Sequence, residues 1–422
     1  MDNRNILVVG GGAAGLIAAG RAAECGAPVV LLEKMNRPGR KLFITGKGRC
    51  NITNTAGADE FISRFGSTGR FLRRPFARFC NTDLMDLMGR MGLGLSVERG
   101  GRVFPSSGKS SDVLSALLVW IKRCGVQVST SSPVDRLLIR DGRITGVVVR
   151  GRRQSCSAVI LATGGSSYPA TGSTGDGYRL AQSAGHSIVP VRPALVPLEA
   201  EGSPAGTMAG LGLRNIEASL FVNGKKRFEA FGEMAFSEFG VTGPVILRLS
   251  GRAVDALRAR RRVHLCIDLK PALDAKKLDA RIERDFTLRA AEPFRSVLRG
   301  LLPRQMVPVC ATLTGIPPGR PAGKVGVKDR RRLRMWLKGF RFEITGHRPF
   351  SEAIITAGGV KTGEINPGTM ESLVTGGLYI AGELLDVHAD TGGYNLQAAF
   401  STGWIAGTSA AMAHASCSRH AP

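Results

Sequence analysis

The sequence has no run of 18 uninterrupted apolar residues, so we expect no segment that crosses a membrane. Its first residues, MDNRNILVVGGG, do not combine a basic region with an apolar stretch and a cleavage site, which argues against a secretion signal. Eight cysteines lie at positions 25, 50, 80, 124, 156, 266, 310 and 417, yet no two form a Cys-x-x-Cys pair, and the six histidines show no metal-ligand spacing. We therefore expect a cytoplasmic protein with free thiols and no bound metal.

Aromatic residues are also scarce. They make up 6% of the 422 residues, so extensive stacking on nucleic-acid bases is not expected. The exceptions are Trp336, Phe340 and Phe342, which lie beside the basic run KDRRRLRMWLKGFRF. Core packing is the simpler interpretation of all three.

Acidic residues are few relative to basic ones. The chain has 58 Lys and Arg against 33 Asp and Glu, a formal net charge of +25. Residues 252–341 hold 23 Lys and Arg against 8 Asp and Glu, a local excess of +15. Such a surface attracts polyanions, and we expect ribosomal RNA or another polyanion to bind through residues 252–341. A solvated face in an arginine-rich protein is the alternative.

Glycine is abundant, with 55 residues and no collagen-like period, which indicates tight turns and places where backbone approaches a ligand. Residues 5–33 have the pattern of a strand, a turn, a helix and a second strand: NILVV, GGGAAG, LIAAGRAAEC and APVVLLEK. Strands of continuous apolar residues favour a parallel sheet that is covered on both faces.

The first turn has the spacing Gly10-x-Gly12-x-x-Gly15 between a strand and a helix, which is typical of a dinucleotide-binding site. The first glycine allows the turn, the second lets a pyrophosphate reach the backbone, and the third lets the helix pack on the strand. The helix N-terminus then presents free N–H groups to the phosphates. Glu33, at the end of the second strand, can accept both hydroxyls of an adenosine ribose. The predicted cofactor-binding residues of this region also include Ala13, Ala14 and Lys34.

The segment GLYIAGELLDVHADTGGYNLQAAFSTGWIAG, residues 377–407, favours FAD over NAD. A strand ends at Gly382-Glu383, and a glycine loop that includes Gly393 leads to a helix near Asn395, Leu396 and Gln397. In FAD enzymes of this general type the acidic residue holds the ribityl chain, and the helix N-terminus stabilises negative charge on the reduced flavin. No second Gly-x-Gly-x-x-Gly follows a strand, so NAD(P)H is expected only as a transient electron donor.

These patterns predict an α/β fold: a Rossmann-type, glutathione-reductase-like FAD-binding domain, split by an inserted β domain and a helical basic domain. The first part of the FAD-binding domain is expected at residues 1–190 and the second part at residues 341–422. Proline-spaced short strands indicate the β-rich insert at residues 191–271, and residues 272–340 are expected to form a helical basic lid. The patterns do not predict an oligomeric state.

Several stretches together resemble the BaiN/RdsA family of bacterial FAD-dependent oxidoreductases, also called aminoacetone-oxidase-like flavoproteins. They are GGGAAGLIAAGRAAECG, GRKLFITGKGRCNITN, FGEMAFSEFGVTGPVILRLS, GGVKTGEINPGTMESLVTGGLYIAGELLD and DTGGYNLQAAFSTGWIAG. The resemblance covers most of the chain and is least distinctive in residues 272–340. It implies a flavoprotein of the two-dinucleotide-binding-domain type and links the chain to steroid enone reduction, amine oxidation or dihydrouridine formation in large-subunit ribosomal RNA.

The resemblance gives a role to the unusual stretch ITGKGRCN. In related flavoproteins the corresponding loop runs along the flavin, so Gly46 and Gly48 would let backbone N–H groups approach the ring. Positive charge for the pyrophosphate or the reduced flavin would come from Arg40, Lys41 and Arg49, and Asn51 would fix the loop. Cys50 would lie near the ring and could donate a proton, which makes it our candidate catalytic residue. A small buried side chain without catalytic function is the alternative for Cys50.

Three further features follow from the same resemblance. VILATGG, residues 159–165, resembles the strand that closes the FAD site, with Thr163, Gly164 and Gly165 near the adenine-pyrophosphate side, and Val134 would contact adenine through its backbone. Glu238 in FSEFGVTGP replaces a histidine that is common in the family, although a plain turn is the simpler interpretation. His388, between two flavin motifs, is the histidine that most merits a test.

We expect the protein to reduce an electron-poor C=C bond by hydride transfer from the flavin, with an acid that protonates the neighbouring carbon. Uridine in large-subunit ribosomal RNA is the leading substrate because of the basic segment, and one target base would have to be unstacked to reach the flavin. A small-molecule enone reductase or amine oxidase of the same fold is one alternative. A non-catalytic RNA-binding flavoprotein is the other.

Overall fold

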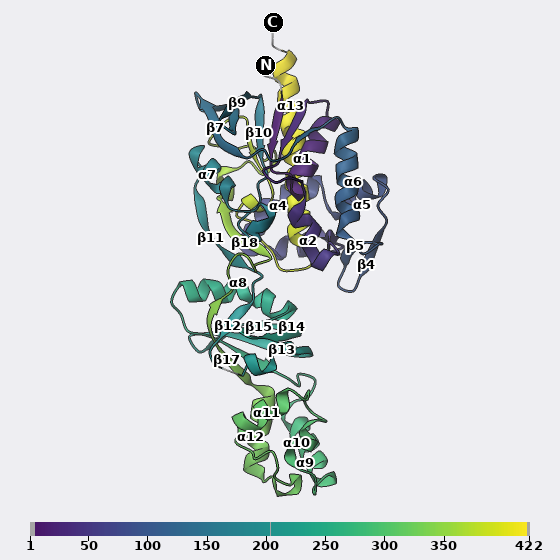
Figure 1. Cartoon of the computed structure of the whole chain (residues 1–422), viewed down its shortest axis with the longest axis vertical. Helices are drawn as coiled ribbons and strands as arrows, with labels where there is room; N and C mark the ends of the chain where they lie inside the picture. Colours follow the sequence, from purple (N-terminus) through teal and green to yellow (C-terminus); the bar gives the residue numbers. More distant parts are fainter. Residues whose placement is uncertain (1–4, 203, 420–422) are drawn as a thin grey trace. The chain divides into compact units, whose positions relative to one another are not determined.

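The computed structural model describes residues 5–202 and 204–419. The chain forms two compact units, one made of Met1–Arg192 and Ile354–Pro422 and the other of Pro193–Ala353 (Figure 1). The first unit contains the glycine-rich motifs from both ends of the chain, and the second contains the basic segment.

A five-stranded parallel sheet forms the centre of the first unit. Its strand order is β19 (Leu378–Ile380), β10 (Ala158–Leu161), β1 (Ile6–Val9), β2 (Val29–Leu32) and β6 (Gln127–Ser129). Ile6 pairs with Val29 on one side and with Ala158 on the other. The predicted parallel sheet is confirmed, since the apolar runs of β1, β2, β10 and β19 are almost entirely buried.

Two glycine- and alanine-rich helices, α1 (Ala13–Glu24) and α13 (Tyr394–Arg419), run side by side against this sheet (Figure 1). A Cβ atom on Gly403 would lie 2.3 Å from the Ala14 carbonyl oxygen, and one on Gly407 would lie 2.4 Å from that of Ala18. The contact between the two helices therefore depends on glycine at these positions of α13. This helix contact joins the glycine-rich motif near the start of the chain to the one near its end.

Smaller elements surround the sheet in the first unit. The helices are α2 (Arg40–Gly48), α3 (Ala58–Ser63), α4 (Gly69–Arg78), α5 (Asn81–Arg90), α6 (Ser110–Arg123) and α7 (Asp176–Ser183), with the 3-10 turn η6 (Gly382–Leu384). One three-stranded sheet has the order β3 (Thr53–Asn54), β5 (Arg102–Pro105) and β4 (Leu95–Glu98). Another has the order β7 (Val134–Arg140), β8 (Arg143–Val149) and β9 (Arg152–Ser155), and β11 (Ile188–Ala194) pairs with β18 (Ile355–Val360).

The second unit is built on a closed β-barrel. Its strands follow the order β12 (Leu198–Ala200), β15 (Gly240–Thr242), β14 (Lys225–Ser237), β13 (Gly212–Val222), β16 (Val263–Asp268) and β17 (Phe340–His347). Helix α8 (Pro244–Arg258) packs against the barrel. Four helices connect β16 to β17: α9 (Ala275–Leu288), α10 (Phe294–Leu298), α11 (Met306–Thr314) and α12 (Val327–Lys338).

The second unit differs from the expectation at its C-terminal boundary. Strand β17 pairs with β12 and β16, so residues 341–347 belong to the barrel, although we expected the FAD-binding domain to resume at residue 341.

The three aromatic residues of the basic run pack as the simpler interpretation predicted. Phe340 and Phe342 are buried in the barrel core, and the Trp336 ring lies 4.8 Å from that of Phe340.

Candidate functional site

The turn between β1 and α1 has the three properties that the glycine spacing predicted. Gly10 adopts φ 100°, and a Cβ atom there would lie 2.6 Å from the Ala162 carbonyl oxygen. A Cβ atom on Gly15 would lie 1.8 Å from the Gly10 carbonyl oxygen, so the helix packs directly on the turn. No heavy atom lies within 4 Å of the Cβ position of Gly12. Gly12 is also the residue before α1 and provides no side-chain cap, which leaves the first N–H groups of the helix, at Ala13 and Ala14, for an anion.

Glu33 and Lys34 follow β2 and have different surroundings. The Glu33 carboxylate is buried and accepts hydrogen bonds from the N–H groups of Gly11 and Met35, each at 2.8 Å. It is therefore held on the glycine-rich turn, where a ribose hydroxyl would be its further partner. The Lys34 ammonium forms a 2.6 Å ion pair with Asp176 at the start of α7. Its charge is thus already compensated by a carboxylate.

Lys41 and Glu383 meet although they are 342 residues apart. The Lys41 ammonium lies 2.6 Å from one carboxylate oxygen of Glu383 and donates to the Ser167 hydroxyl at 2.5 Å. The other carboxylate oxygen accepts from the Ser167 hydroxyl at 3.1 Å and from the Thr356 N–H at 2.8 Å. We predicted both charged residues as cofactor ligands but not their contact. Ser167 and Thr356 are polar partners that the sequence analysis missed.

The ITGKGRCN stretch is a short helix that ends in a left-handed turn. Thr45 leaves the helical conformation, and the next residues, Gly46 and Lys47, have φ of 58° and 56°. Arg49 pairs with Glu98 and lies 4.3 Å above the Phe104 ring, so its guanidinium is directed to the sheet of β4 and β5. Arg40 begins α2, and Gly48 has no heavy atom near its Cβ position, which leaves its backbone accessible.

Cys50 is fully buried in the core of the first unit. Burial raises the pKa of its thiol to about 11, and a hydrogen bond with Thr45 opposes this rise. A thiol in this state is a poor nucleophile and a weak acid. These observations favour the interpretation of Cys50 as a small packing residue over a catalytic role. The neighbouring Asn51 has a buried side-chain oxygen with no hydrogen-bond partner among the described residues.

The segment after β10 lies at the same edge of the sheet as the first turn, because β10 pairs in parallel with β1. Thr163 has a buried hydroxyl with no hydrogen-bond partner in the described part of the chain. Gly164 has φ 74°, and a Cβ atom on Gly165 would lie 2.5 Å from the Thr356 hydroxyl oxygen. Val134 starts β7, where it is buried and pairs with Val149.

Side chains at the N-terminus of α13 make contacts within the first unit. A Cβ atom on Gly393 would lie 2.3 Å from the Thr53 carbonyl oxygen, so no larger residue fits there. The Asn395 side chain accepts from the Ala389 N–H at 2.8 Å and donates to its carbonyl at 3.0 Å, which shapes the preceding loop. Gln397 is fully buried and accepts from the Thr53 hydroxyl at 2.6 Å. Leu396 is half-buried and packs against the core.

These residues fit a bound FAD. The carboxyl ends of β1, β10 and β19 lie at one edge of the sheet and are followed by Gly10, Thr163 and Gly382. The buried polar atoms without a partner among the described residues include those of Asn51, Thr163 and Tyr178. Such an atom costs about 1–3 kcal/mol unless a ligand or water satisfies it. Tyr178, on α7, gave no signal in the sequence analysis because a single tyrosine in a helix has no distinguishing pattern.

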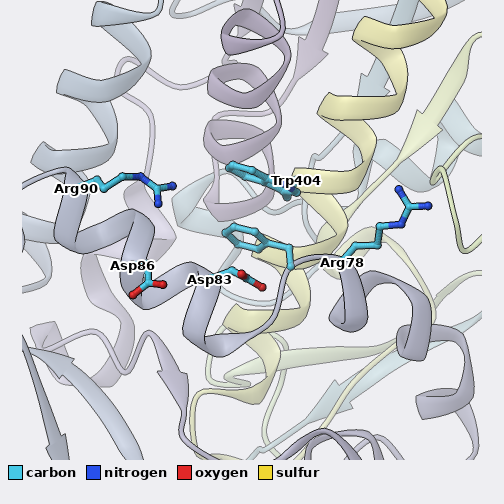
Figure 2. Close-up of a pocket in the computed structure, with 6 residues that line it drawn as sticks. Arg78, Asp83, Asp86, Arg90 and Trp404 are labelled. Atoms are coloured by element: carbon cyan, nitrogen blue, oxygen red, sulfur yellow. The ribbon is translucent and has the colours of Figure 1, made fainter.

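A separate small pocket of about 130 Å³ lies where α4, α5 and α13 approach one another (Figure 2). The Phe79 and Trp404 rings stack there at 4.3 Å, and Arg21 lies over Trp404 at 4.4 Å. Side chains of both charge signs complete its lining: Arg78, Asp83, Asp86 and Arg90. None of the predicted cofactor-binding residues lines this pocket.

Two kinds of feature are absent from the part of the chain that the structure describes. No group of three or more His, Cys, Asp or Glu side chains there is placed to hold a metal ion. None of the described helices is long and apolar enough to cross a bilayer. The side chain of Cys417 lies outside the described residues, whereas the other seven cysteines are free thiols.

The fold and the glycine-rich edge define a Rossmann-type dinucleotide-binding flavoprotein. The chain has this fold in common with a flavocytochrome c3 fumarate reductase in its open conformation, with a TM-score of 0.54 and 20% identity over 97% of this chain and 78% of the other. The family model described as HI0933-like protein Rossmann domain matches residues 4–409. The chain belongs to this family, which confirms the resemblance noted from the sequence, and it is an FAD-dependent oxidoreductase.

Two curated relatives are similar to this chain over nearly its whole length. The 3-dehydro-bile acid delta(4,6)-reductase of Clostridium scindens is 32% identical over 96% of this chain and 98% of the relative. The ribosomal RNA dihydrouridine synthase of Escherichia coli is 27% identical over 96% of this chain and 97% of the relative.

Proposed function

We propose that the protein reduces the C=C bond of uridine in large-subunit ribosomal RNA. The relative from Escherichia coli is a ribosomal RNA dihydrouridine synthase, which makes this chemistry the natural comparison. The relative from Clostridium scindens reduces a bile acid, so one family accommodates substrates of very different size. The observation that favours RNA for this chain is the charge balance of helices α9–α12.

In these helices and their connections, residues 270–338, every carboxylate already has a cationic partner. The six acidic residues in this segment are Asp274, Asp279, Glu283, Asp285, Glu292 and Asp329, each in at least one ion pair. Seven exposed cations have no ion pair among the described residues: Lys276, Arg295, Arg299, Arg304, Lys324, Lys328 and Arg331. The excess positive charge is therefore not neutralised within the segment, and phosphates would be suitable partners.

The cofactor would be held by groups from both ends of the first unit. Backbone N–H groups after Gly12 would bind the pyrophosphate, Glu33 the adenosine ribose, and Glu383 the ribityl chain. The N-terminus of α13 would favour negative charge on the pyrimidine side of the ring. When bound, FAD supplies the hydride for the reduction, and NAD(P)H is the proposed transient source of electrons.

The deciding experiment is dihydrouridine mapping of ribosomal RNA in a strain that lacks the protein. We expect one modified position to be lost and to return when the wild-type gene is supplied. A variant with Arg295, Arg299, Arg304, Lys328 and Arg331 changed to Gln should not restore it. The matched control carries the same loss of five charges in the first unit, at Lys122, Arg123, Arg136, Arg152 and Arg153, and should restore the modification.

In vitro, RNA-binding measurements on the same two variants distinguish an effect of the charge of α9–α12 from an effect of the net charge of the protein. The variant in α9–α12 should bind a ribosomal RNA transcript more weakly and lower the slope of log K against log [salt] by up to about 4, whereas the control should change it little. An unchanged modification map in the deletion strain would refute RNA as the substrate. Tight RNA binding without dihydrouridine would favour the non-catalytic alternative.

The second candidate is reduction of a small enone, which the 32% identical bile-acid reductase favours. An α,β-unsaturated ketone requires the same addition of hydride and proton as uridine. Turnover of a 3-oxo-Δ4 bile acid that is insensitive both to RNA and to neutralisation of the five cations would support this candidate.

A further inference from the structure

Three segments that carry ionisable side chains contact β18, and none of them belongs to the dinucleotide-binding turn. Tyr178 comes from α7, Arg192 from β11, and Asp386 and His388 from the segment between η6 and α13. This last segment begins beside Glu383 and ends at the N-terminus of α13, and both of its ends are predicted to face the reactive half of FAD.

Two glycines of β18 allow these segments to approach one another. A Cβ atom on Gly358 would lie 2.5 Å from the Pro190 carbonyl oxygen in β11. A Cβ atom on Gly359 would lie 2.5 Å from the Leu384 carbonyl oxygen, on the other side. The N–H of Asp386 donates to a carbonyl of β18 at 2.9 Å. Strand β18 is therefore in backbone contact both with β11 and with the segment that carries Asp386.

The Asp386 carboxyl lies in the electrostatic field of His388 and Arg192. Burial raises the pKa of the Asp386 carboxyl, and the positive charges of His388 and Arg192 oppose this rise. An N–H of Gly358 bonded to the carboxyl also opposes it. Asp386 is thus a half-buried carboxyl whose charge is balanced by an imidazole and a guanidinium.

Tyr178 adds a hydrogen-bond donor to this group. Its side chain is only 7% exposed, and its hydroxyl has no hydrogen-bond partner in the described part of the chain. Burial raises the pKa of the phenol, and the nearby carboxylates of Glu383 and Asp386 raise it further. The phenol therefore stays protonated, and a ligand oxygen would satisfy it.

We propose that His388 is the acid that protonates the substrate carbon, that Asp386 positions its imidazole, and that Tyr178 donates a hydrogen bond to the substrate carbonyl. This inference rests on the proposed reduction of a C=C bond conjugated to a carbonyl. One carbon of the double bond receives hydride from reduced flavin, which is oxidised by two electrons. The other carbon receives the proton of the His388 imidazolium, which becomes neutral and is protonated again from solvent.

Among the side-chain types in this cluster, imidazole is the one that can hold and release a proton near neutral pH. The phenol of Tyr178 releases its proton too reluctantly, and the Asp386 carboxylate is suited to stabilise an imidazolium. The other charged groups that face the cluster are Arg192 from β11 and Glu383 from η6.

The test is a single-turnover experiment on the FAD-loaded protein. Photoreduced enzyme is mixed without oxygen with a large-subunit ribosomal RNA transcript or with a 3-oxo-Δ4 bile acid, and flavin reoxidation is followed at its visible absorbance. His388→Gln should slow reoxidation by about 100-fold or more, and Asp386→Asn by a smaller factor. The wild-type rate should fall as pH rises through the imidazole pKa, and His388→Gln should lose this limb of the profile. FAD content and visible spectrum should stay unchanged.

His414→Gln is the matched control, because His414 lies near the far end of α13 and bonds Ser157 at 3.3 Å. It should reoxidise at the wild-type rate. Partial rescue of His388→Ala by added imidazole would support the proton-donor role, because a purely structural role would not produce it. If His388→Gln kept the wild-type rate and pH profile, this inference would be wrong and the proposed function would stand. Failure of the wild-type enzyme to react with either substrate would overturn the proposed function together with it.

Discussion

The contact between Lys41 and Glu383 allows a quantitative test of the site. It joins the start of α2 to η6, the turn that follows β19, and each side chain is 21% exposed. Exposed ion pairs contribute about 0.2–1 kcal/mol, whereas breaking a buried pair costs about 3–5 kcal/mol. At this intermediate exposure we expect a coupling free energy of about 1–3 kcal/mol between the two residues.

The measurement is a double-mutant cycle with Lys41→Met, Glu383→Gln and the double variant. Chemical unfolding of the FAD-free protein gives the coupling free energy. In Lys41→Met the Glu383 carboxylate keeps the Ser167 hydroxyl and the Thr356 N–H as partners, so we expect the variant to fold. FAD titration of the same variants should show binding weakened by about tenfold in Lys41→Met, which corresponds to about 1.4 kcal/mol.

The control pair is Arg320 and Asp329, which lie 2.6 Å apart in the second unit. Neutralising either residue should leave FAD affinity unchanged. The reasoning would be refuted if the Lys41–Glu383 coupling were below about 0.5 kcal/mol, the range of an exposed surface pair. It would also be refuted if Lys41→Met bound FAD as tightly as the wild type.

Three further predictions concern the first unit. Gly407→Val should destabilise it by about 1–3 kcal/mol in a denaturant titration, because the new Cβ atom would lie 2.4 Å from the Ala18 carbonyl oxygen; an unchanged midpoint would contradict the close helix contact. Cys50 should resist iodoacetamide at pH 8 in the folded protein, because burial raises its thiol pKa to about 11, and Cys50→Ala should keep most activity; rapid labelling would argue for a reactive thiol. Burial lowers the pKa of His186, and Glu364 only partly opposes this, so the unfolded chain binds the proton more readily. Stability should therefore fall as pH drops below about 6.5, and His186→Gln should weaken that dependence.

Much of the first unit could be predicted from the sequence because its signals are local. The strands Ile6–Val9, Val29–Leu32 and Ala158–Leu161 are short, wholly apolar runs, as expected for strands buried on both faces. The dipeptide Asp141-Gly142 is typical of a tight hairpin turn, and both residues adopt the positive φ that such a turn requires. At these positions the signal comes from residues that are adjacent in the sequence.

The parts that the sequence did not predict depend on distant contacts. Barrel closure requires β17 to pair with β12, and no local pattern encodes a partner about 140 residues away. The direction of Arg49 was also unpredictable, because the left-handed turn before it directs its guanidinium to Glu98 and Phe104. We expected Arg49 to serve the cofactor from its position in the motif, and its contacts in the structure are with the neighbouring sheet.

The close packing of α1 on α13 couples the turn that is predicted to bind the pyrophosphate to the loop that is predicted to face the flavin. Helix α1 begins at the pyrophosphate turn, and α13 begins at the loop that is predicted to face the flavin ring. Glycines at 403 and 407 allow the two backbones to touch, so neither helix can shift without moving the other. Gly382 strengthens this link, since a Cβ atom there would lie 2.8 Å from the Ala14 side chain. A perturbation in the last thirty or so residues should therefore weaken FAD binding even where it touches no predicted cofactor ligand.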